Sequence, residues 1–254
     1  MAIEASWLPD GVSATTAAII VLSSFFTSAL TAAFGLGGGL ALLAILGAAA
    51  PPAAAIPVHA VAQLGSNASR LIIQFRHVAW SIALWFVAGS ALGSAIGARL
   101  FVEIPGALLQ GVIGVFVLLT VFGPKPKGFA PGVKTYFATG AASAVLSMFV
   151  GATGPIAASM LRVAALDRLK TVATHAAAMT GQHAIKAAAF GIIGFAYAQW
   201  ATLIAAMLIA GFFGAIAGTR LLRIMPEKTF RTGFTAAISF LGCYLVVSSI
   251  LDLV

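Results

Sequence analysis

The chain has 254 residues, of which 61% are hydrophobic and only 8% are charged, and its mean hydropathy is +1.08. A soluble domain of this length could not bury so much apolar surface, so the composition excludes a soluble globular protein and indicates a polytopic membrane protein. The net charge of +8 does not indicate nucleic acid binding, because Lys and Arg gather on the cytoplasmic loops of membrane proteins.

The first apolar segment contains no Lys, Arg, Asp or Glu over 59 residues, from Gly11 to Ser69. A single helix of that length would be about 88 Å long, whereas the hydrocarbon core of a bilayer is about 30 Å thick. The segment must therefore enter the membrane more than once. It is broken at 35–39 (GLGGG), and irregular backbone at membrane depth is tolerated only where protein or a water-filled cavity satisfies it. No basic region precedes this run, so we expect a membrane span and no cleaved signal peptide.

An all-α fold of ten membrane segments is expected, with five segments in each half of the chain. In chain order they are 12–34, 38–50, 53–74, 78–98 and 107–122, then 133–150, 154–166, 170–190, 198–222 and 230–252. Between the two sets, 123–128 (GPKPKG) is typical of a linker. The predicted organisation is an N-terminal membrane repeat at 1–123, a linker at 124–132 and a C-terminal membrane repeat at 133–254.

The two halves resemble each other in sequence. Residues 59–70 (HAVAQLGSNASR) match residues 175–186 (HAAAMTGQHAIK) at five of twelve positions, with Arg70 opposite Lys186. At the same offset of 116 residues the glycines of the two breaks also match, Gly35 with Gly151 and Gly38 with Gly154. The sequence therefore predicts an internal repeat.

The basic residues predict the orientation of the segments. With ten segments, twelve of the fourteen Lys and Arg residues lie on one side of the membrane, and only Arg99 and Lys186 on the other. If 53–74 and 170–190 did not cross, the chain would have eight full spans and the split would be nine to five. The positive-inside rule favours ten segments, with both termini outside the cytoplasm and the halves inverted. Segments 38–50 and 154–166 are too short to span fully, and we expect half-helices or re-entrant segments.

A polar stripe runs along one face of the third segment in each half. The first stripe consists of His59, Gln63, Ser66, Asn67 and Arg70. The second stripe consists of Thr171, His175, Gln182, His183 and Lys186, with Met179 in place of Gln63. Ionisable groups inside the membrane are costly and usually face a cavity or one another. The alternatives are a hydrogen-bonded helix seam and, for Arg70 and Lys186, snorkelling to the headgroups.

Each glycine break opens a short segment and is a candidate anion site. The first break holds Gly35, Gly37, Gly38 and Gly39, and the second holds Gly151, Thr153 and Gly154, followed by Pro155. Free N–H groups at a helix N-terminus bind anions, and two such ends entering from opposite sides would converge near the centre. Close helix packing is the alternative explanation of the glycines.

The stripes and the breaks together form a donor-rich set that suits an oxyanion. No carboxylate lies in the predicted membrane interior, which disfavours a cation site. An intramembrane enzyme and an anion channel remain alternatives, but neither an HExxH nor a GxSxG motif occurs. We expect no metal site and no cofactor.

The glycine break after the first segment, its counterpart in the second half, and the endings at 97–100 (GARL) and 218–221 (GTRL) resemble the TauE/SafE family of membrane permeases. The resemblance covers essentially the whole chain. It implies a multi-pass transporter of the bacterial inner membrane that exports small sulfur-containing anions such as sulfite, sulfoacetate or related organosulfonates. The expected partners are that anion and the lipid bilayer, with a homodimer left open. The second break (GATGP at 151–155) departs from a run of glycines, which leaves the particular anion undetermined.

Histidine is the side chain that titrates near neutral pH, where oxyanions such as sulfite also change protonation state. His59 and His175 occupy equivalent positions in the two halves. Protonation of these rings and binding of an anion should favour each other. The two histidines are therefore the candidates for proton coupling.

Overall fold

The fold is all-helical. The computed structural model describes residues 8–34, 37–100, 106–122, 132–164, 166–221 and 227–253, and these ranges contain no strand. In chain order the elements are α1 (Ala14–Phe34), α2 (Gly38–Ala49), α3 (Pro52–Gln74), the 3₁₀ helix η1 (Phe75–His77), α4 (Trp80–Leu100), α5 (Gly106–Phe122), α6 (Val133–Val150), α7 (Gly154–Val163), α8 (Arg168–Ile192), α9 (Tyr197–Leu221) and α10 (Glu227–Leu253). Each of the ten predicted segments falls on one α-helix, which confirms the all-α prediction. Of the predicted linker at 124–132, only Gly132 lies within the described residues, and Gly35 lies outside them.

Local sequence explains where several helices begin. Pro52 opens α3 and Pro155 lies in the first turn of α7, positions where a missing backbone N–H costs nothing. Asp167 caps α8, because its carboxylate accepts a hydrogen bond from the backbone N–H of Lys170 at 2.8 Å. This bond also lowers the pKa of the exposed Asp167 carboxyl.

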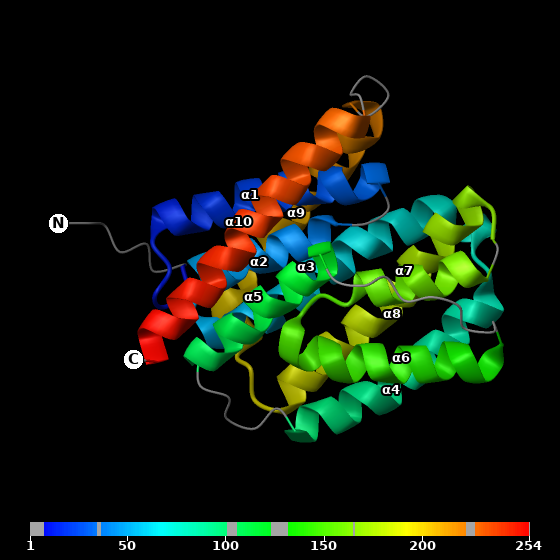
Figure 1. The fold of residues 1–254 in the computed structure, drawn as a ribbon, viewed down its shortest axis with the longest axis horizontal. Helices are drawn as coiled ribbons and strands as arrows, with labels where there is room; N and C mark the ends of the chain where they lie inside the picture. Colours follow the sequence, from blue (N-terminus) through cyan, green and yellow to red (C-terminus); the bar gives the residue numbers. More distant parts are fainter. Residues whose placement is uncertain are drawn as a thin grey trace.

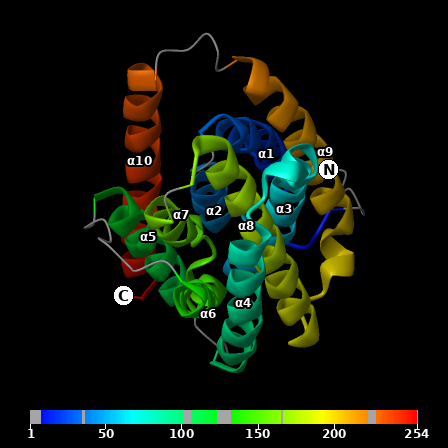
Figure 2. The ribbon, with the colours of Figure 1, turned by 90° about the vertical axis from the view of Figure 1, so that its right-hand side faces the viewer.

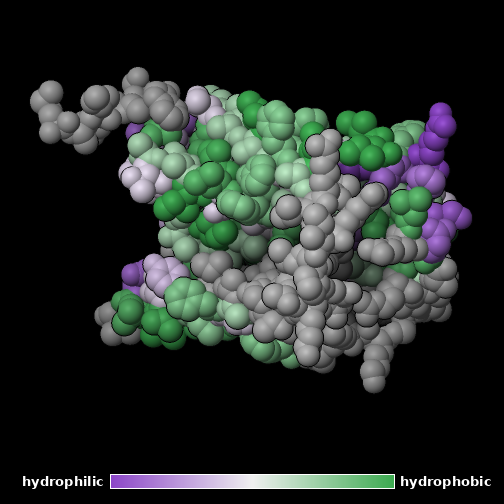
Figure 3. Space-filling view, turned by 90° about the horizontal axis from the view of Figure 1, so that it is seen from above, coloured by the Kyte–Doolittle hydropathy of each residue, from purple (hydrophilic) through white to green (hydrophobic). Residues whose placement is uncertain are grey.

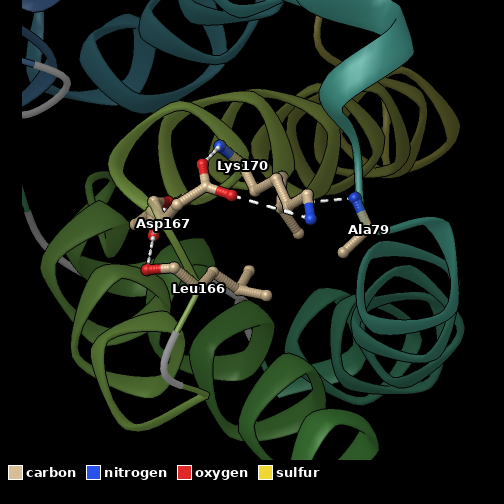
Figure 4. Close-up of polar contacts among 6 residues, drawn as sticks. Ala79, Leu166, Asp167 and Lys170 are labelled. Atoms are coloured by element: carbon tan, nitrogen blue, oxygen red, sulfur yellow. Dashed lines mark hydrogen bonds and ion pairs between the residues drawn. The ribbon is translucent and has the colours of Figure 1, made fainter.

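The first turns of α8 also anchor the turn before α4 (Figure 4). The Lys170 ammonium lies 3.6 Å from the Asp167 carboxylate, and the backbone N–H of Ala79 donates to the Thr174 hydroxyl at 2.9 Å. The turn before α4 is thereby held against the first turns of α8.

Four helix pairs dominate the packing: α1 with α9, α4 with α6, α3 with α8, and α5 with α10. In the end-on view of Figure 2, α2, α3, α7 and α8 lie inside a ring formed by the other helices. Glycines bring the outer helices close together, since a Cβ on Gly93 of α4 would overlap the Ala141 carbonyl of α6. A Cβ on Gly214 of α9 would overlap the Phe25 carbonyl of α1 in the same way. Gly93 and Gly214 are 121 residues apart, which is also the spacing between 97–100 (GARL) and 218–221 (GTRL). Phe25 and Ala141 are 116 apart, which is the offset of the matched segments 59–70 and 175–186.

The two ends of the bundle differ in what they carry. In Figure 1, α1 begins and α10 ends at the left-hand end, whereas the α3–α4 and α7–α8 turns lie at the right-hand end. Figure 3 shows hydrophilic side chains gathered at this right-hand end and hydrophobic ones along the flank. Exposed Arg76 and Lys170 belong to the two turns at that end. An apolar flank beside an end that carries basic residues is typical of the surface of a membrane protein.

Four helices of the described part are long and apolar enough to cross a bilayer, over Ala14–Ala32, Trp80–Leu100, Val133–Val150 and Tyr197–Gly218. The central helices α3 and α8 are long enough but carry the polar stripes, which lower their hydropathy. With 12 and 10 residues, α2 and α7 are half-length, as their sequences predict. The two long polar helices, α3 and α8, therefore lie inside the bundle, and the four apolar membrane-length helices lie around them.

Candidate anion site

A small, partly open cavity lies where the two halves of the chain meet, with a volume of about 40 Å³. The first half contributes side chains and backbone from α1, α2 and α3: Thr31, Gly37, Gly39, Leu40, His59, Gln63, Asn67 and Arg70. The second half contributes residues at the start of α7 and along α8: Ala152, Gly154, Pro155, His175, Met179 and His183. The two polar stripes and the two glycine breaks thus meet at one place.

The N-termini of α2 and α7 both reach this cavity. The first helical bond of α2 runs from Ala41 N to Gly37 O, so the amides of Gly38, Gly39 and Leu40 precede the hydrogen-bonding ladder of the helix. Neither helix has a side-chain cap among the described residues. Open helix ends of this kind carry a partial positive charge and donate N–H groups to anions.

Three histidines line the cavity and are almost completely buried, with exposed fractions of 1% for His59, 6% for His175 and 3% for His183. The Nε2 atom of His59 lies 2.8 Å from the Gly39 carbonyl oxygen, and that of His175 lies 3.2 Å from the Gly154 carbonyl oxygen. Because a carbonyl only accepts hydrogen bonds, Nε2 must carry the proton in both rings. The His59 and His183 rings meet edge to face, with centroids 5.7 Å apart.

The Nδ1 atoms of these three rings are buried and have no hydrogen-bond partner among the described residues. In a neutral ring with a proton on Nε2, Nδ1 is an acceptor and does not attract an anion. In a protonated ring, Nδ1–H is a donor with a full positive charge. A proton on these rings would therefore convert the cavity wall from acceptor to donor.

Two basic side chains lie inside the protein and do not reach the surface. Arg70 is 4% exposed, lines the cavity, and donates from Nη2 to the Asn67 side-chain oxygen at 2.5 Å. Lys186 is completely buried and donates to the Gly151 carbonyl at 2.5 Å, beside the C-terminus of α6. Snorkelling is therefore the wrong explanation for both side chains. Lys186 has a structural role as well, because a cation stabilises a helix C-terminus.

The carboxylates of the described side chains, Asp10, Asp167 and Asp252, are exposed. None of these three described carboxylates pairs with the buried Lys186 ammonium, which favours an anionic ligand. Among the described residues, no group of three His, Cys, Asp or Glu side chains could hold a metal ion.

Several predicted site residues lie away from the cavity. Gly38 packs against α1, where a Cβ would overlap the Thr27 carbonyl, so this glycine is explained by helix packing. Ser66 faces Ser28, with hydroxyl oxygens 3.4 Å apart. The others outside the cavity wall are Gly151 and Lys186, which bond to each other, and Thr153 and Gln182, which share a buried hydrogen-bond cluster.

Some residues of the cavity wall were not predicted from the sequence. Thr31 follows Thr27 by one helical turn on α1, so the two hydroxyls lie on one face of the helix. This spacing is the sequence feature that could have identified Thr31 as a wall residue. Leu40, Ala152 and Pro155 flank the predicted glycines but carry no polar side chain, so nothing in the sequence marked them. Their presence makes part of the wall apolar.

An all-helical bundle with membrane-length apolar helices around a cavity lined by polar side chains is the architecture of a polytopic membrane protein, and it fits a membrane transport protein. The chain matches the family described as "Sulfite exporter TauE/SafE" over residues 20–245. It therefore belongs to the TauE/SafE family of sulfite exporters. Comparison with curated proteins and with solved structures found no match.

Proposed function

We propose that the protein is a secondary transporter that exports a small sulfur-containing anion, sulfite in the first instance, and binds it in the cavity between the two halves. The observation that carries this proposal is the convergence of two open helix N-termini and three buried histidines on one cavity. Membership of a family of sulfite exporters supports the same chemistry.

The size of the cavity favours a compact inorganic anion. A cavity of about 40 Å³ holds only a few water molecules or one small ion. Sulfoacetate and other organosulfonates carry an additional carbon chain and would require the helices to separate. The wall combines backbone N–H donors, the side-chain amides of Gln63 and Asn67, and the Arg70 guanidinium, which match the oxygens of a small oxyanion.

The transport cycle would use the two halves as inverted repeats at 1–123 and 133–254, joined by the linker at 124–132. In support, the close contacts of α4 with α6 and of α9 with α1 recur at the repeat offsets. In a bacterial inner membrane, the positively charged end of the bundle would face the cytoplasm and both termini would lie outside it. Rocking of one half against the other would then expose the site alternately to each side.

The proposal also includes proton coupling through His59 and His175. Both rings use Nε2 to hold the backbone at the start of a half-helix, which leaves Nδ1 to gain or lose a proton beside the anion. Binding of the anion and protonation of Nδ1 would stabilise each other, so both would move together.

The experiment is binding of sulfite to the purified protein, followed by counterflow in liposomes. A carrier gives saturable uptake of labelled sulfite that is driven by unlabelled sulfite inside, whereas a channel gives unitary currents in planar bilayers. Sulfoacetate is the comparison ligand and should bind more weakly than sulfite. Absence of sulfite binding at every pH between about 5.5 and 8 would refute the proposed function.

A further inference from the structure

The centre of the cavity wall follows the sequence repeat. Three positions of α3 line the cavity together with the residues 116 positions later on α8, which are His59 with His175, Gln63 with Met179, and Asn67 with His183. Two further polar side chains of the wall are Thr31 and Arg70. Their counterparts at the same offset, Ser147 and Lys186, are buried but do not line the cavity. The cavity therefore includes the hydroxyl and the cation of the first half and excludes those of the second.

The Ser147 hydroxyl is completely buried and has no hydrogen-bond partner among the described residues. Its counterpart Thr31 donates at 2.9 Å to the carbonyl four residues earlier, that of Thr27. The carbonyl four residues before Ser147 is that of Ser143, and Thr153 Oγ1 already donates to it at 3.2 Å. A buried hydroxyl without a partner is rare in folded proteins, so Ser147 suits a ligand that reaches it in another state.

The Lys186 ammonium also has unused hydrogen-bonding capacity. It carries three N–H donors, and its one hydrogen bond within the described part of the chain goes to the Gly151 carbonyl at the second glycine break. Lys186 lies close enough to the His59 and His183 rings to act on both electrostatically. This cation therefore lies beside two rings of the cavity wall without reaching the cavity.

Arg70 and Lys186 lie toward opposite ends of the bundle. The α3–α4 and α7–α8 turns lie at the same end, so α3 and α8 run in opposite directions (Figure 1). Arg70 is four residues before the end of α3 at Gln74, about 6 Å from that end. Lys186 is 18 residues beyond the start of α8 at Arg168, about 27 Å from the same end. The three cavity histidines fall between these two depths.

We infer that Lys186 and Ser147 bind the anion in the opposite state of the transport cycle, when the site opens toward the other end of the bundle. In that state Lys186 leaves the Gly151 carbonyl and donates to the anion, and Ser147 gains the partner that it lacks here. Arg70 and its neighbouring hydroxyl withdraw from the cavity in exchange. A cation thus stays beside the anion in both states, which avoids leaving a buried charge without compensation.

This inference rests on the proposed function and is tested by counterflow of labelled sulfite in right-side-out and inverted membrane vesicles. Lys186→Met should raise the half-saturating sulfite concentration about tenfold at the outer face, the usual value of one hydrogen bond to a charged group. At the cytoplasmic face the change should stay within about threefold. Arg70→Met should give the reverse pattern, with its large effect at the cytoplasmic face. Lys186→Arg retains the charge and should restore the outer-face value to within about threefold of wild type.

Ser147→Ala separates binding from a structural role, because the hydroxyl that it removes has no partner here. Its melting temperature should equal that of wild type, while half-saturation at the outer face rises about threefold. This variant also replaces Lys186→Met if the latter does not yield folded protein. Lys170→Met is the control, since it removes an exposed cation of α8 that does not line the cavity, and it should leave both faces unchanged.

The inference is wrong if Lys186→Met changes both faces equally or neither, or if it and Arg70→Met weaken the same face. A reversal of the two faces would support the exchange of cations and would invert the proposed orientation in the membrane. If the wild type shows no saturable sulfite counterflow from either face, the proposed function fails and the inference fails with it. Normal counterflow by the wild type, with variants that do not distinguish the faces, would refute the inference alone.

Discussion

The two halves of the cavity differ in the chemistry that they present to an anion. The first half contributes Gln63, Asn67 and Arg70 beside a helix end that opens with glycine. The second half contributes Met179, His175 and His183 beside a helix end that carries Pro155. Proline has no N–H group, so α7 offers fewer amides than α2. One half of the cavity wall is thus richer in fixed donors and the other is richer in titratable rings.

The largest expected effect comes from the glycines at the two breaks. Gly38 and Gly154 match in sequence, yet a Cβ on Gly38 would overlap the Thr27 carbonyl, whereas a Cβ on Gly154 would lie 3.7 Å from His175 Nε2, an ordinary contact. Gly38→Ala should therefore disrupt the packing of α1 with α2 and abolish folded protein. Gly154→Ala should fold and lose about tenfold in sulfite affinity, because its methyl group adds bulk at a small cavity.

Size-exclusion profiles and thermal unfolding separate these two outcomes, and sulfite binding is then measured on the folded variant. Gly132→Ala is the control, since a Cβ there meets nothing within 4 Å. Normal folding of Gly38→Ala would show that the close packing at this break is not required.

The histidines should give the next largest effect. If one proton accompanies the anion, sulfite affinity of the wild type should fall by up to about tenfold for each pH unit of increase above neutrality. His59→Gln and His175→Gln retain a donor to the backbone carbonyl but cannot gain a proton, so their affinity should vary much less with pH. Exposed His77, which lies outside the cavity, provides the control variant His77→Gln. Three parallel curves for wild type, His59→Gln and His175→Gln would exclude both rings as the coupled site.

A reciprocal exchange tests the difference between Gln63 and Met179. Gln63→Met removes an amide from the cavity wall and should weaken sulfite binding about fivefold, whereas Met179→Gln adds an amide and should strengthen it about threefold. Met179→Leu conserves volume and should leave affinity within about twofold. Equal affinities for all three variants would mean that neither position contacts the anion.

The smallest effect concerns the cap of α8, which does not line the cavity. The pKa of Asp167 is lowered by the backbone N–H of Lys170, so the charged carboxylate stabilises the fold at neutral pH, and that contribution is lost as pH falls through the lowered pKa. Asp167→Ala should therefore lower the melting temperature slightly at pH 7 and less at about pH 3. The control Lys170→Met removes only an exposed ion pair and should have a smaller effect. An equal deficit for Asp167→Ala at both pH values would contradict this role.

The pattern of apolar residues and the composition were sufficient to predict the helices and their order. Long apolar runs separated by charged turns leave few alternatives in a membrane protein. The face of the stripe in α3 was also predictable, and His59, Gln63, Asn67 and Arg70 all line the cavity. The same reasoning could not separate Gly38 from Gly39, because adjacent glycines look alike in sequence while one faces α1 and the other faces the cavity.

The partners of buried polar groups could not be predicted either. Gln182 and Thr153 belong to residues that suit anion binding, yet they bond to each other and to Ser143 across three helices. Such contacts depend on how α6, α7 and α8 pack, and sequence spacing along one helix carries no information about them.

The most direct test of the central claim is a crystal structure of the protein with selenite, a heavier analogue of sulfite whose selenium gives an anomalous signal. The account predicts one ordered anomalous peak in the cavity, within hydrogen-bonding distance of the first-turn amides of α2 and of a histidine Nδ1. A selenite ion that binds tightly in solution but is found only outside this cavity would contradict the account.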